Sequence, residues 1–208
     1  MNTVPLFNVA RDTRIGSGFF AWYRTRVWLL TAAHVPLCEP NPQPNWTEWP
    51  ETLSVHLGNG RMPLQLSLFE EGTGRRPRFC HLLHDTGMAD FMALPVPSSY
   101  FESNGPFSII LRLSLQTAVL PVSDATVRAF GYPSAAPDWP SYPPHCQRVT
   151  VESADANRVN FSPLSLPGMS GGPLLTDREE LCGLIIGNNG SGRAVSPIAM
   201  RHIIDISF

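Results

Sequence analysis

The sequence has little charge and no excess of either sign. Only 15% of its residues are charged, and 15 Lys and Arg stand against 17 Asp and Glu, which gives a formal net charge of -2. A chain without a basic excess has little with which to neutralise phosphates. We therefore expect neither nucleic acid nor an anionic membrane surface as a partner.

Long apolar runs and closely spaced cysteines are also absent. The start of the chain lacks the apolar core of a signal peptide, and no later run reaches the length of a membrane-spanning helix, which predicts a cytoplasmic protein. The four cysteines, Cys38, Cys80, Cys146 and Cys182, form no CxxC pair. This spacing predicts reduced thiols, mostly small apolar fillers, and offers no metal-ligand cluster.

Proline and glycine, in contrast, are abundant, with 21 Pro and 16 Gly among 208 residues. Their spread excludes long helices before the C-terminus and predicts many short strands, as in barrels or sandwiches. The predicted strands are residues 18–23, 27–31, 53–57, 63–69, 79–83, 91–95, 126–130, 147–152, 158–161, 173–175, 181–186 and 194–196. A short capped helix is predicted over residues 196–206, where Ser and Pro precede residues at helical spacing.

Irregular segments suggest how the chain is divided. Residues 37–51 and 132–146 are rich in Pro and Trp and follow neither a strand nor a helix period, which favours surface loops. A polar, turn-rich stretch at residues 97–107 predicts the break between two halves, about residues 1–100 and 101–208. At this length the two halves are expected to form one domain.

The strongest chemical signal is Ser170, within the sequence GMSGGP at residues 168–173. A serine hydroxyl becomes a nucleophile when a base takes its proton, and glycines beside it let backbone N–H groups approach a developing oxyanion. Taken alone, this motif is also typical of a Gly-rich turn.

A candidate base and a candidate acid precede Ser170 in the chain, and each adjoins an apolar run. His34 ends the sequence TAAH directly after an apolar run, and a catalytic base needs such a rigid position at the end of an element. Asp90 directly precedes the apolar run at residues 91–94, where it can accept a hydrogen bond from the base. Asp85 competes for this role, and Asp90 is favoured because it abuts the apolar run.

The segments GSGF, TAAH, ADFMAL, AFGYP and GMSGGPLL, in this order, resemble the chymotrypsin clan of serine peptidases. Within the clan the chain is most similar to the disulfide-poor HtrA-like peptidase domains, here without a PDZ domain, and the resemblance covers nearly the whole chain. It implies an all-β fold of two six-stranded antiparallel barrels of the chymotrypsin type with a short C-terminal helix. The chain departs from digestive members at Met169, where they have Asp.

The resemblance implies a serine endopeptidase that works through an acyl-enzyme and without a cofactor. Ser170 attacks the carbonyl carbon, His34 takes and returns the proton, Asp90 orients the imidazole, and the N–H groups of Gly168 and Ser170 form the oxyanion hole. Proteins or peptides are the expected substrates, and a regulatory protein partner is a further expectation. The alternatives are an esterase with the same triad and a catalytically silent binding module.

The same resemblance suggests a primary substrate pocket. It places Leu164 near the floor and residues 184–187, including Ile186 and Gly187, in the wall. Because neither place is acidic, we expect cleavage after Leu, Val, Met, Ala or Phe, whereas a buried Lys or Arg would lack a partner. Arg193, close by, either faces solvent or attracts an acidic side chain. The segment at residues 132–146 either borders the site or is a solvated connector.

Overall fold

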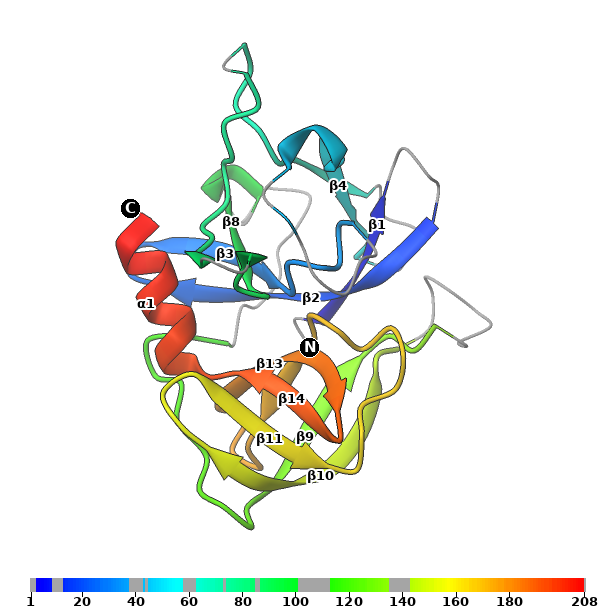
Figure 1. The fold of residues 1–208 in the computed structure, drawn as a ribbon, viewed down its shortest axis with the longest axis vertical. Coiled ribbons are helices and arrows are strands. Elements are labelled where there is room, and N and C mark those ends of the chain that lie inside the picture. Colours follow the sequence, from blue (N-terminus) through cyan, green and yellow to red (C-terminus); the bar gives the residue numbers. More distant parts are fainter. Residues whose placement is uncertain are drawn as a thin grey trace.

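The chain folds into two antiparallel β units with a helix along their common side (Figure 1). The structure, a computed structural model, describes residues 3–8, 13–37, 43, 45–57, 63–72, 74–84, 87–100, 113–134 and 143–207. Within these ranges the first unit lies between the N-terminus and residue 96, and the second begins at residue 126. This arrangement confirms the predicted all-β fold.

The N-terminal barrel is a six-stranded antiparallel sheet in the order β5-β4-β1-β2-β3-β8. Its strands are β1 (Thr3–Asn8), β2 (Thr13–Tyr23), β3 (Arg26–Thr31), β4 (Thr52–Val55), β5 (Leu64–Ser67) and β8 (Met92–Val96). Large apolar side chains fill its interior. Phe19 and Leu30, for example, are paired across β2 and β3, and both are fully buried. Two neighbouring strands of this sheet, β3 and β8, adjoin the residues predicted to be the base and the acid.

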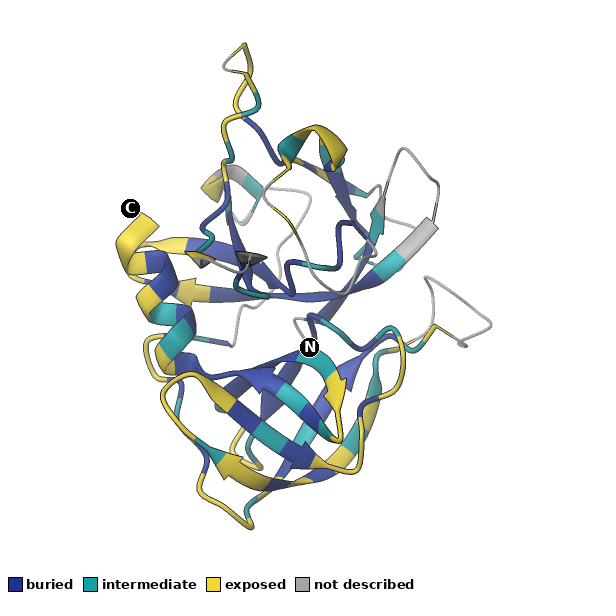
Figure 2. Cartoon of the chain, viewed as in Figure 1, coloured by how far each residue is buried: buried dark blue, intermediate teal, exposed yellow. Residues whose placement is uncertain are grey.

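The C-terminal barrel is closed, in the order β10-β11-β14-β13-β12-β9. Its strands are β9 (Thr126–Gly131), β10 (His145–Ala154), β11 (Arg158–Ser162), β12 (Pro173–Leu175), β13 (Leu181–Asn189) and β14 (Ser191–Val195). Along β11 and β14 buried residues alternate with more exposed ones, as Figure 2 shows. Val151, Phe161 and Ile185 belong to the resulting core.

Helix α1 (Pro197–Ser207) joins the two barrels. Ser196 caps it, because the Ala199 N–H donates to Ser196 Oγ at 3.1 Å, which confirms the predicted capped helix. Near its C-terminal end Asp205 accepts a hydrogen bond from the Tyr23 hydroxyl of β2 at 3.0 Å. Within the described residues, no helix is long and apolar enough to cross a membrane.

The smaller elements belong to the N-terminal half of the chain. They are the hairpin of β6 (Leu83–His84) with β7 (Gly87–Met88), and two short 3-10 helices, η1 (Trp46–Glu48) and η2 (Ser98–Tyr100). The hairpin ends at Met88, two residues before the predicted acid, Asp90.

Several strand predictions were wrong in detail. Strand β1 was not predicted because Pro5 interrupts its apolar pattern, yet it pairs with both β2 and β4. The strand predicted at residues 79–83 is reduced to a single bridge from Cys80 to Ala93, and β6 begins only at Leu83. The segment at residues 37–51 is not wholly a surface loop, because Trp49 is buried and stacks on Phe79, with the ring centroids 5.2 Å apart.

The cysteines in the described residues are free thiols. Cys80 and Cys182 are buried, as predicted for apolar fillers, whereas Cys146 is exposed at the start of β10. Cys38 lies outside the described residues. Burial raises the pKa of both buried thiols to about 12.

Candidate active site

The predicted base and acid are hydrogen-bonded to each other. His34 follows β3, and Asp90 lies two residues before β8, the strand that pairs with β3. The ring Nδ1 of His34 lies 2.8 Å from Asp90 Oδ2 and 3.0 Å from Oδ1, and the backbone N–H of His34 donates to the same Oδ1 at 3.0 Å. The carboxylate therefore holds both the ring and the main chain of the histidine. Asp85, the competing acid, lies outside the described residues.

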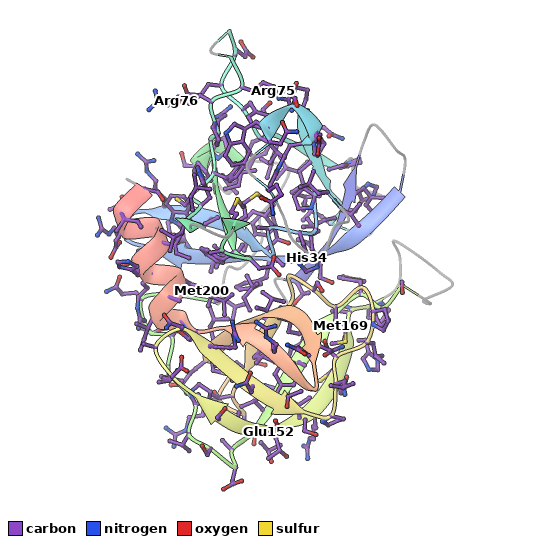
Figure 3. The ribbon with its side chains drawn as sticks, in the orientation of Figure 1. His34, Arg75, Arg76, Glu152, Met169 and Met200 are labelled. Atoms are coloured by element: carbon purple, nitrogen blue, oxygen red, sulfur yellow. The ribbon has the colours of Figure 1, made fainter. Side chains whose placement is uncertain are left out.

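The Ser170 turn of the C-terminal barrel is hydrogen-bonded to β2 of the N-terminal barrel. The Ser17 N–H donates to the Ser170 carbonyl at 2.9 Å. A Cβ built at Gly16 would lie 3.0 Å from the γ-carbons of Val35 and 3.1 Å from the Ser170 carbonyl oxygen. Ser170 and the residue after His34 thus pack against the same point of β2. In Figure 3, His34 lies where the two barrels meet.

Close packing around this turn explains why residue 171 is a glycine. Gly171 has φ +86, and a Cβ built there would lie 1.9 Å from the Ser17 carbonyl oxygen and 2.4 Å from Thr31 Oγ1. Any larger residue would both strain the backbone and push the turn away from β2.

Ser17 is a site residue that the sequence reasoning did not single out. Its fully buried hydroxyl donates to the Gly168 carbonyl at 2.9 Å and accepts from the Tyr132 N–H at 2.8 Å. It therefore links β2 both to the turn before Ser170 and to the end of β9. The available signal was its position in the GSGF segment, since a small buried polar residue in an apolar strand needs specific partners.

Two backbone N–H groups of the Ser170 turn make no hydrogen bond to the described residues. Among the described residues, neither the Gly168 N–H nor the Ser170 N–H donates to a protein acceptor. Within the same set no hydrogen bond joins Ser170 Oγ to His34. Catalytic hydrogen bonds of this kind are often long without substrate and tighten when it binds.

The predicted pocket residues are divided between two faces of the β13–β14 hairpin. On one face Asn188 accepts hydrogen bonds from the Ser165 N–H and hydroxyl, at 3.1 and 3.0 Å, and donates to the Ser165 carbonyl at 2.9 Å. Leu164, beside Ser165, is about half exposed. On the other face Ile186 and Arg193 line a cavity that also contains Asp90. Leu164 and Arg193 therefore do not share a pocket.

Among the described residues, no three His, Cys, Asp or Glu side chains gather closely enough to hold a metal ion. The polar groups at the site are thus an imidazole with its carboxylate, a serine on a facing turn, and two backbone N–H groups. This set fits acyl transfer, in which a serine attacks a carbonyl carbon and the N–H groups stabilise the oxyanion.

Comparisons with known proteins agree with this geometry at the level of the fold. No protein-family model and no curated protein matches the sequence. Among solved structures, the MamO protease domain of Magnetospirillum magneticum aligns over 100% of this chain and 95% of its own, with TM-score 0.60 and 15% identity. The inactive form of the Rv3671c protease aligns over 99% and 88%, with TM-score 0.59 and 15% identity. The HtrA-type protease AlgW, with a tripeptide, aligns over 99% and 58%, with TM-score 0.55 and 16% identity.

These likenesses define the class of fold. The protein has the chymotrypsin-type fold of the trypsin-like and HtrA-type serine protease domains, with two six-stranded antiparallel barrels and a C-terminal helix. The resemblance inferred from the sequence motifs is confirmed at this level. Activity is a separate question, because unrelated functions are built on common folds.

Proposed function

We propose that this protein is a serine endopeptidase with His34, Asp90 and Ser170 as its catalytic triad. The observation that carries the proposal is the 2.8 Å contact between His34 Nδ1 and Asp90 Oδ2, in the barrel that faces the Ser170 turn. A carboxylate bonded to Nδ1 keeps the proton on that nitrogen, which leaves Nε2 to take the serine proton. The carboxylate then stabilises the imidazolium that forms.

The oxyanion hole would consist of the Gly168 and Ser170 N–H groups, which donate to no protein acceptor among the described residues. Donors that are already aimed at the developing charge need no reorganisation during the reaction, which makes them worth orders of magnitude in rate. The turn is fixed from behind, since Gly171 N–H donates to the Ile185 carbonyl at 2.7 Å. His34 would later return its proton to the leaving amine, and water would release the acyl group by the reverse steps.

Strand β13 offers an edge for the substrate backbone. Ile185 is hydrogen-bonded to Gly171 and Gly172 of the serine turn, and the pairing of β13 with β12 ends at Leu184. From Gly187 to Asn189 the described residues pair β13 only with β14. An extended peptide can add to such an open edge as a further strand and so lie across Ser170.

The Asn188–Ser165 bridge narrows the space for the residue before the scissile bond. Three hydrogen bonds hold the amide between β13 and the segment preceding Ser170. Next to it, a Cβ built at Gly192 would lie 2.2 Å from the ring of the buried Phe161, so the core already fills that side. We therefore expect Ala and Val to be preferred over Leu, Met and Phe within the apolar set.

An active-site probe tests the proposal directly. A fluorophosphonate should label the wild-type chain and leave the Ser170→Ala variant unlabelled, while circular dichroism shows the same fold for both. A peptide-library digest should then give cleavage after small apolar residues, absent with Ser170→Ala. Labelling that persists in Ser170→Ala would exclude this nucleophile, and a profile dominated by Lys and Arg would exclude the pocket.

The missing hydrogen bond between Ser170 Oγ and His34 favours a second candidate, a silent module that holds a peptide without cutting it. Such a module would bind library peptides but would neither label nor cleave. An esterase would label and would hydrolyse activated esters, yet it would leave the peptides intact. Four assays, of peptide binding, labelling, peptide cleavage and ester hydrolysis, thus separate the three functions.

A further inference from the structure

A cavity of about 720 Å³ lies behind the candidate catalytic acid, between the two barrels and α1. Asp90 and Phe91 contribute to its N-terminal side, Arg158, Ile186 and Arg193 come from the C-terminal barrel, and α1 closes the remaining side. The described lining is mostly apolar. The titratable groups that face the cavity are the ones that decide which ligand fits.

Those groups are Asp90, Arg158, Arg193 and His202, so two guanidinium groups face one carboxylate. Asp90 is already bonded to His34. Among the described residues neither arginine makes an ion pair, and the Nε of Arg193 is buried without a hydrogen-bond partner. A buried donor without a partner is costly, and such groups in folded proteins usually meet a water or a ligand.

The two arginines are close enough to repel each other. Arg158 and Arg193 lie on adjacent strands, β11 and β14, on the face opposite the buried Val159 and Ala194. Burial and the Arg158 charge lower the pKa of Arg193, while Asp90 raises it. A second carboxylate placed between the guanidinium groups would relieve this repulsion.

Gly187 leaves Arg193 accessible from the substrate side. The two residues are paired across β13 and β14, so a side chain at position 187 would lie over the guanidinium. Gly187 has φ +117, and a Cβ built there would meet no atom within 4 Å. The open space above the β13 edge therefore leads to Arg193.

We infer that this cavity binds an acidic side chain of the substrate, with Arg193 as its main contact and Arg158 as the second. The inference rests on the proposed endopeptidase function. It assigns a preference for Glu or Asp at the second or fourth position before the scissile bond. The site therefore selects an acidic peptide with a small apolar residue at the point of cleavage.

Strand geometry gives these positions. Side chains of a peptide added to β13 alternate between its two faces. The residue before the scissile bond faces Asn188 and Ser165, and the third residue before the bond shares that face. Because the register of β13 shifts between Ile185 and Gly187, Ile186 lies on the face opposite Asn188. The second and fourth residues before the bond therefore face Ile186 and Arg193. A carboxylate at the third position therefore points away from the cavity and serves as an internal control.

The test uses one cleaved parent peptide with Gln at the second, third and fourth positions before the bond, and three versions with a single Glu. For the wild-type chain, Glu at the second or fourth position should raise kcat/KM by about tenfold, as expected for a charge-assisted hydrogen bond, and Glu at the third should not. Equal rates for all four peptides would overturn the inference.

Variants assign the effect to Arg193. Arg193→Gln should abolish the gain in kcat/KM from Glu, and Arg158→Gln should reduce it. Arg193→Lys should retain part of the gain. Arg178→Gln removes the same charge from the exposed β12–β13 turn, at the opposite end of β13, and should keep the gain. If Arg193→Gln lowers kcat/KM equally for all peptides, the residue positions Asp90 instead and the inference is wrong.

Binding to the Ser170→Ala variant separates this inference from the proposed function. Fluorescence anisotropy of labelled peptides measures the preference for Glu over Gln without any turnover. A preference in binding that disappears with Arg193→Gln supports the inference even where the wild-type chain cleaves nothing, a result that would refute only the endopeptidase. Cleavage by the wild-type chain with equal binding of Glu and Gln peptides leaves the endopeptidase standing and refutes the acidic site.

Discussion

Replacing Ser17 by Ala is the sharpest test of how the site is held. The hydroxyl donates to the Gly168 carbonyl at 2.9 Å and accepts from the Tyr132 N–H at 2.8 Å, and the residue has no exposed surface. The substitution deletes one oxygen and fits the same space. Its effect should therefore report the two hydrogen bonds and little else.

The expected magnitude follows from the buried groups left behind. A buried polar group that loses its partner costs about 1–3 kcal/mol, so the two together should lower the free energy of unfolding by about 3 kcal/mol. In a protein of this size that corresponds to a fall in Tm of about 6–12 °C. Because the N–H of the same residue, Gly168, is a proposed oxyanion donor, loosening Gly168 should reduce the rate by about tenfold to a hundredfold, less than removing a donor outright.

The measurements are thermal unfolding and the rate of fluorophosphonate labelling, each compared with Ser134→Ala. Ser134 donates to the Pro167 carbonyl near the same turn at 3.3 Å, but it is exposed, so its loss should change Tm and rate little. If Ser17→Ala and Ser134→Ala behave alike in both assays, the turn is not held through Ser17.

Two further predictions concern single side chains. Asp90→Asn should lower kcat by about 10⁴, since the amide favours the wrong tautomer of His34, whereas Asp85→Asn should be mild; equal losses in a peptide-cleavage assay would contradict the assignment. Burial, with a smaller effect of Glu180, raises the pKa of Cys182 from 9.0 to about 12, so the unfolded chain loses that proton first and stability should decline above about pH 9. The resulting loss in the free energy of unfolding reaches up to about 4 kcal/mol near pH 12. For Cys182→Ala, the free energy of unfolding measured in urea should decline less steeply as pH rises.

Local patterns explain which parts of the fold could be predicted. β3 and β12 coincide closely with apolar runs, and the helix start follows from Ser196 and Pro197. Strand β1 could not be predicted because Pro5 breaks its pattern, and its place between β2 and β4 is set by pairing with distant segments. Strand β13 continues to Asn189 past the apolar residues, since the polar end is held by the hairpin with β14.

The candidate site divides in the same way. His34, Asp90 and Ser170 stand in motifs whose order along the chain carries the information, so they could be named from the sequence. Ser17 could not, because its role depends on Gly168, a residue 151 positions away. The position of Arg193 depends on which face of β14 it occupies, and a one-residue change in register would reverse it.

The two halves of the candidate triad are positioned from one residue of β2. The Ser17 N–H donates to the Ser170 carbonyl at 2.9 Å, and its own carbonyl accepts from Thr31 Oγ1 at 2.8 Å, at the end of the strand that leads to His34. The nucleophile and the base thus come from different barrels, yet the segments that carry them are both hydrogen-bonded to the Ser17 backbone. Their separation therefore depends in part on these two hydrogen bonds of Ser17. A substitution that disturbs Ser17 should therefore lower the reaction rate as well as the stability of the fold.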